Sequence, residues 1–119
     1  MGCGRLFEGT AHDLYTSLER YTPLHDETLV ACAHEYTQSN AAFCLSIEPN
    51  NAELVARAAE VDALRAADLP TVPSTLGSER QTNSFLRTSE PNVAGGAGLS
   101  SDADPADVFE TLRLLKDNF

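Results

Sequence analysis

The chain has 119 residues, enough for one domain or part of one. Its 18 acidic side chains outnumber its 8 basic ones, and the net charge of -10 excludes nucleic acid and anionic membrane surfaces as partners, because both bind basic surfaces. No apolar run reaches the roughly 18 residues of a membrane span, and residues 1–10 lack the pattern of a signal peptide. We therefore expect a soluble, cytoplasmic protein.

The first third of the chain predicts a helix, a strand and a second helix. Thr10, with Asp13 three residues on, is typical of the capped start of a helix. The apolar run Leu29 to Ala33 is too short for a helix and predicts a strand. Thr37 then supplies an oxygen that can cap a helix from Gln38 onward.

The middle of the chain predicts two packing helices. Residues 38–48 are apolar around most of the helix circumference, which indicates a buried helix. Asn50 is expected to cap a longer helix, because Leu54 and Val61 begin and continue a single apolar stripe after it.

Two later segments lack helical periodicity. Residues 70–77 contain two prolines, which disfavour the helical region for the residues before them, so a connector or short edge strand is expected there. Residues 90–104 place glycines among small polar residues and predict a mobile loop.

The final helix has the clearest start signal, with Asp104 at the N-cap and Pro105 at the first helical position. We expect its buried face to carry Val108, Leu112 and Leu115. Arg113 and Lys116 lie three residues apart and therefore project from a common side. Two adjacent cations in an acidic chain indicate an anion held between them; the alternative is that they complement the negative end of the helix dipole.

His34 stands between the predicted strand and the predicted second helix, where open α/β folds place their ligand chemistry. The alternative is an ordinary loop histidine. Cys32 and His34 could also share a metal, but a structural zinc takes four ligands and no second pair lies nearby. The chain's three cysteines include no C-x-x-C pair and indicate reduced thiols.

Five blocks of the sequence share one pattern. They read GCGRLFEGT at 2–10, CAHEYT at 32–37 with SN at 39–40, PTVPSTLG at 70–77, TNSFLR at 82–87 and LRLLKD at 112–117. In this order they resemble hydroxyacylglutathione hydrolase, the glyoxalase II family, over essentially the whole chain. The resemblance implies a mostly α fold with a short β remnant. Residues 1–36 would end a metallo-β-lactamase-like αβ/βα domain, and residues 37–119 would form the helical glutathione-recognition domain.

The resemblance also implies roles for individual residues. His34 matches a ligand of the family's dinuclear metal centre, which holds zinc alone or mixed with iron or manganese. Tyr36, Arg113 and Lys116 match residues that hold glutathione, the two cations binding its glycine carboxylate. Arg5 stands where the family has Lys or Arg beside glutathione. The anion indicated by the Arg113 and Lys116 pair would then be glutathione.

The chain departs from the family pattern in several places. Phe7 stands where some members carry a glutathione-binding tyrosine, Ala33 replaces a glycine and Ser84 replaces a proline. The family's His-x-His-x-Asp-His loop, a further histidine and the bridging aspartate all precede the segment seen here. Without two metals there is no activated hydroxide to attack a thioester. We therefore expect this chain alone to bind no metal and to be inactive.

Two functions from different classes follow. In the first, the chain is the substrate-recognition half of an enzyme that hydrolyses S-D-lactoylglutathione to D-lactate and glutathione in methylglyoxal detoxification, completed by an N-terminal half. In the second, it is a non-catalytic module derived from that enzyme, which binds glutathione or another anion or serves as a helical interaction surface.

Overall fold

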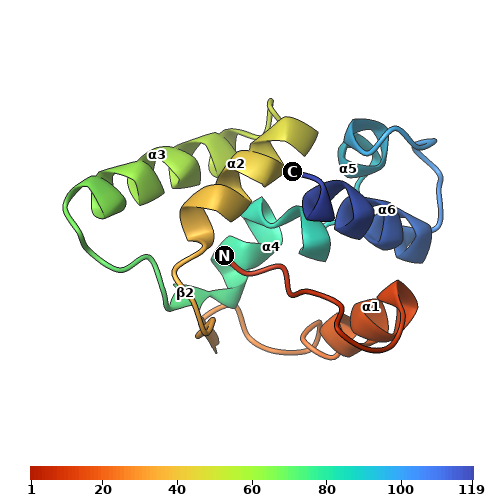
Figure 1. The fold of residues 1–119 in the computed structure, drawn as a ribbon, viewed down its shortest axis with the longest axis horizontal. Coiled ribbons are helices and arrows are strands. Elements are labelled where there is room, and N and C mark those ends of the chain that lie inside the picture. The colour runs from red at the N-terminus through yellow and green to blue at the C-terminus, as the bar shows by residue number, and fades with distance from the viewer.

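Six helices and a two-stranded sheet make up the chain in a computed structural model that describes residues 1–119 (Figure 1). The helices are α1 Ala11–Glu19, α2 Thr37–Ile47, α3 Ala52–Ala66, α4 Leu76–Thr82, α5 Pro91–Gly96 and α6 Pro105–Asp117, with a 3-10 turn at Ser84–Leu86. The strands are β1 Leu29–Val30 and β2 Ser74–Thr75. The expectation of a mostly α fold with a short β part is confirmed. None of the helices combines the length and hydrophobicity needed to cross a membrane.

The helix starts follow local capping chemistry. Thr10 and Asp13 form a complete capping box at α1, because each side chain bonds the backbone of the other. Asp104 caps α6 by accepting from the N–H of Ala106. The predicted cap of α3 is wrong by one residue, since it is Asn51 that accepts from the N–H of Leu54.

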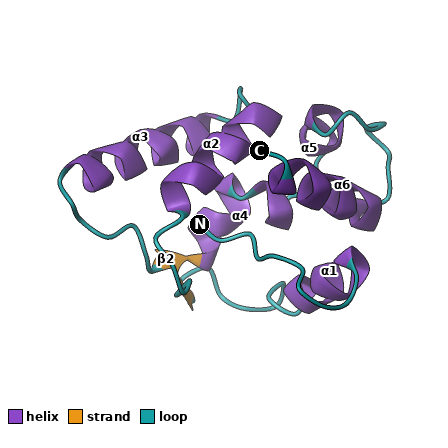
Figure 2. Cartoon of the chain, in the orientation of Figure 1, coloured by secondary structure: helices purple, strands orange, loops and turns teal.

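The sheet is smaller than the apolar run predicts. Only Leu29 and Val30 pair, antiparallel to Thr75 and Ser74, and the pair lies at one edge of the molecule (Figure 2). Beyond Val30 the next residue of the partner strand is Pro73, which has no N–H to donate, so the ladder stops there. Residues 31–33 of the expected strand form no ladder, and the chain bends at Ala33.

Three aromatic rings at the centre join helices from different parts of the chain. The rings of Phe43 and Phe85 stack 5.8 Å apart, and Phe109 meets Phe85 edge-on at 5.6 Å. Around them α2 packs along α3, and α1 packs against α6. On α6 the buried face carries Val108 and Leu112 as expected, but Leu115 is 42% exposed.

The segment predicted as a loop at 90–104 contains α5. Pro91 at its first position is compatible with a helix start, and Val93 is fully buried. The helix ends against α2 at Gly96, where a β-carbon would overlap the carbonyl oxygen of Ile47. Burial of Val93 and this close approach thus override the loop-like composition.

Gly96 and Gly95 offer a matched test of this packing. We expect Gly96→Ala to destabilise the fold by about 1–3 kcal/mol, because the added methyl group must displace backbone. Gly95 has open space around it, so Gly95→Ala should be neutral or stabilise by up to about 1 kcal/mol. Urea unfolding of both variants measures the difference. Equal stabilities would contradict the close approach of α5 to α2.

Candidate functional site

A mostly apolar groove of about 560 Å³ lies between the first residues of the chain, α1 and the segment that follows β1. Three of the residues singled out from sequence, Arg5, His34 and Tyr36, line it. Arg113 and Lys116 do not belong to its lining. The structure therefore brings three candidate residues to one groove and places the two cations of α6 outside it.

His34 and Tyr36 lie side by side at the N-terminus of α2. Their rings stack with centroids 5.1 Å apart and an interplanar angle of 22°. Tyr36 is the N-cap residue of α2 and is 62% exposed, so its hydroxyl is free to meet a ligand. Thr37, expected as the cap, is instead the first helical residue.

Glu35, between these two rings, points the other way and anchors the segment. Its carboxylate accepts from the hydroxyl and from the backbone N–H of Thr71, the latter at 3.0 Å. The hydroxyl and the N–H of Thr71 lower the pKa of Glu35. Arg57 of α3 holds the same threonine by donating to its carbonyl oxygen at 3.1 Å. Sequence reasoning gave Glu35 no role, because the partner is 36 residues away.

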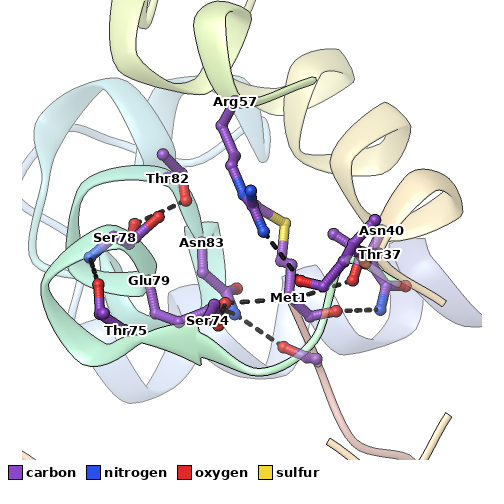
Figure 3. Close-up of polar contacts among 12 residues, drawn as sticks. Met1, Thr37, Asn40, Arg57, Ser74, Thr75, Ser78, Glu79, Thr82 and Asn83 are labelled. Atoms are coloured by element: carbon purple, nitrogen blue, oxygen red, sulfur yellow. Dashed lines mark hydrogen bonds and ion pairs between the residues drawn. The ribbon is translucent and has the colours of Figure 1, made fainter. Parts of the chain in front are cut away.

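Residues 1 and 2 are held by side chains from two sides, and Figure 3 shows Asn40 and Asn83 on either side of Met1. From α2, the amide of Asn40 donates to the carbonyl of Met1 at 3.1 Å. From the end of α4, the amide of Asn83 donates to the carbonyl of Gly2 at 2.7 Å. The buried carboxylate of Glu79 accepts from Asn83 at 2.9 Å and lies 3.2 Å from the nitrogen of Met1. These contacts fix the path of the chain toward Arg5.

Arg113 holds the next two residues of the same segment. Its guanidinium donates to the carbonyls of Gly4 at 2.5 Å and Cys3 at 3.2 Å, and to the carboxylate of Asp117 at 2.8 Å. It lies 5.3 Å from the centre of the Phe85 ring and is only 4% exposed. Its Nε has no hydrogen-bond partner. In this structure Arg113 is directed toward the backbone before Arg5, not toward solvent.

Lys116 makes a different set of contacts. Its ammonium lies 3.3 Å from the hydroxyl of Ser39, in the first turn of α2, and over the rings of Phe43 and Phe119 at 5.6 and 5.1 Å. Arg113 and Lys116 therefore share a helix but no partner. Lys116 is also the basic residue in the last turn of α6, as the helix-dipole alternative expects.

Metal chemistry needs more ligands than this chain brings together. No three His, Cys, Asp or Glu side chains form a group that could hold a metal ion. His34 is a single potential ligand, whereas zinc sites use three or four protein ligands. The residues of this chain do not fit the metal centre that the family resemblance implies.

Comparison with known proteins gives consistent matches along the chain. A family model described as the hydroxyacylglutathione hydrolase C-terminus matches residues 35–119. The hydroxyacylglutathione hydrolase of Ruegeria pomeroyi is 52% identical over 119 residues, all of this chain and 46% of the relative. That of Rhodospirillum rubrum is 52% identical over 118 residues, which are 99% of this chain and 46% of the relative. The chain spans about half the length of the curated relatives it matches.

The Glu35 anchor predicts a specific sensitivity to acid. Because the fold lowers its pKa, Glu35 stabilises the folded chain at pH values above 4.5, the ordinary pKa of a glutamate. This contribution is lost as the pH falls through the lowered pKa. Thr71→Val removes the hydroxyl donor and should raise the pKa of Glu35 toward 4.5. The variant should therefore be less stable than the wild type near neutral pH, and the difference should shrink in acid.

Urea unfolding across the acid range and NMR titration of the Glu35 carboxyl measure these effects. The pKa values of Asp13 and Asp102 are also lowered by neighbouring hydroxyls, so the informative quantity is the difference between variant and wild type. Thr16→Val, an exposed site on α1, is the control. A stability difference for Thr71→Val that stays constant with pH would contradict the anchor.

Proposed function

The chain belongs to the hydroxyacylglutathione hydrolase family as its C-terminal part, and we propose that it recognises the glutathione portion of a thioester substrate. The observation that carries this proposal is the convergence of Arg5 and Tyr36 on one groove. A guanidinium and a phenol supply donors for carboxylate and amide groups. A cation at a groove of a chain with net charge -10 favours an anionic ligand.

The two cations of α6 take separate parts in this proposal. Lys116 reaches Ser39, one turn beyond Tyr36, and can bind the glycine carboxylate by exchanging its hydroxyl contact for a charged one. Arg113 is committed to the carbonyls of Cys3 and Gly4. We therefore assign it a positioning role, in which it fixes the segment that presents Arg5.

Hydrolysis belongs to the complete enzyme in this proposal. One histidine does not make a metal site, so His34 would contribute a single ligand beside others that the preceding half supplies. The complete enzyme would hydrolyse a 2-hydroxyacyl thioester of glutathione, with S-D-lactoylglutathione as the expected substrate. A binding module without catalysis remains the second candidate, because the groove and its donors are present without a metal cluster.

Titration of the whole chain with glutathione, followed by NMR, tests recognition directly. We expect weak binding with shifts at the groove, since one wall of a cleft gives few contacts. Arg5→Gln and Lys116→Gln should each weaken binding about tenfold, as expected for a lost charge-assisted hydrogen bond. Arg65→Gln on α3 is the matched control and should leave binding unchanged. Absence of shifts at the groove at millimolar glutathione would contradict the proposal.

Lys116, His34 and Arg113 are expected to have different roles in a complete enzyme built with this half. Measurements of kinetics and stability separate these roles. Lys116→Ala should mainly raise KM, because a remote contact binds substrate and transition state alike. His34→Ala should lower kcat. Arg113→Ala should raise KM and also reduce stability by about 2–4 kcal/mol, since it leaves two backbone carbonyls and Asp117 without their partner. An Arg113→Ala variant as stable as the wild type would contradict the positioning role.

A further inference from the structure

The segment between β1 and α2 lines the groove with residues 31–34. Residues 31–35 make no backbone hydrogen bond with any part of the fold. The side chains of His34 and Tyr36 are exposed, so burial does not hold them either. The stack that these two rings form in the groove therefore depends on what fixes the backbone between them.

Glu35 supplies the only hydrogen bonds that join residues 31–35 to the rest of the fold. It does not line the groove, and both oxygens of its carboxylate accept from Thr71 on the other side of the segment. His34 and Tyr36 are its direct neighbours in the chain. One side chain that points away from the groove thus holds the backbone from which both rings project.

Thr71 is a firm partner for this carboxylate. It is only 3% exposed, and its carbonyl accepts from Arg57 of α3 at 3.1 Å. Further along the same segment, β2 pairs with β1, and the N–H of Leu76 donates to the carbonyl of Thr28 at 2.8 Å. Residues 71–76 therefore hold the chain on both sides of residues 31–34, through backbone bonds before them and through Glu35 after them.

We propose that Glu35 is a positioning residue for ligand recognition. Held by Thr71, it keeps His34 and Tyr36 stacked in the groove and so sets where the hydroxyl of Tyr36 meets glutathione. The identity of the ligand rests on the proposed function. Two hydrogen bonds to one carboxylate fix its direction as well as its distance. Without them the exposed rings would sample more rotamers, and ordering them on binding would lower the affinity.

The ring stack gives a readout that needs no ligand. Protons of His34 that lie over the Tyr36 ring are shifted upfield by its ring current, and NMR at about pH 8, where histidine is neutral, measures this shift. In Glu35→Ala we expect most of the shift to be lost. Thr71→Ser keeps both donors and should retain it, whereas Thr71→Val keeps only the N–H and should lose part of it.

Two control variants separate positioning from a general loss of stability. Gly96→Ala is expected to destabilise the contact of α5 with α2, which lies outside the groove lining, and should leave the stack unchanged. Glu110→Ala removes an exposed carboxylate on α6, also outside the groove lining, and should leave the stack unchanged as well. Circular dichroism melting reports the stability of each variant. Thr71→Val retains the test if Glu35→Ala does not fold.

Titration of the same variants with glutathione measures the effect on recognition. Glu35→Ala should bind glutathione about three- to tenfold more weakly than the wild type, as expected for one displaced hydrogen-bond donor. Thr71→Ser, Gly96→Ala and Glu110→Ala should bind it like the wild type.

Several outcomes would overturn the positioning role. They are an unchanged ring-current shift in Glu35→Ala and an equal loss of that shift in Gly96→Ala. Loss of the shift in Glu35→Ala with wild-type affinity for glutathione would overturn the role in recognition and leave the proposed function standing. A wild-type chain that shows the Glu35-dependent shift but binds no glutathione would support the positioning of the rings and count against the proposed function. The two proposals therefore fail separately.

Discussion

The contact between Arg113 and the carbonyls of Cys3 and Gly4 joins the last helix to the first residues of the chain, and the position of the groove depends on it. The guanidinium is buried between the Phe85 ring and this backbone, so its loss would take the donor from both carbonyls. A carbonyl that loses its donor costs free energy to the extent that water does not replace the donor. Because Arg5 follows directly, the same contact sets where a positive charge enters the groove.

The other side chains that hold the first residues of the chain include neutral amides, which act in the same way. Asn40 and Asn83 come from different helical segments, and each donates to one carbonyl at the start of the chain. A hydrophobic contact would tolerate sliding of the segment, whereas a buried amide satisfies its partner in one arrangement only. These hydrogen bonds therefore fix the path of an irregular segment across the helices. Apolar packing alone would let the segment shift. Glu35 anchors the opposite wall in the same way, through Thr71.

Local signals predicted most elements of this fold, and tertiary contacts decided the rest. The capping box at Thr10 and the cap at Asp104 could be predicted from the sequence, because donor and acceptor lie within one helical turn. Arg113 was expected to face an anion and Leu115 to face the core. Instead Arg113 is buried and Leu115 is partly exposed. The sequence could not indicate this, because the partner of Arg113 is Gly4, 109 residues away. The family resemblance identified candidate residues, but only the fold shows that three of them share a groove.

The proposed position of glutathione in the groove has a thermodynamic consequence. Arg5, His34 and Tyr36 all line the groove, so under the proposed function a part of the complete enzyme that covers the groove would also contact bound glutathione. Coupling between two binding events is reciprocal, and a partner that tightens glutathione binding must itself be bound more tightly by the same factor when glutathione is present. Under the proposed function, recognition of glutathione and completion of the enzyme would therefore be linked through this one groove.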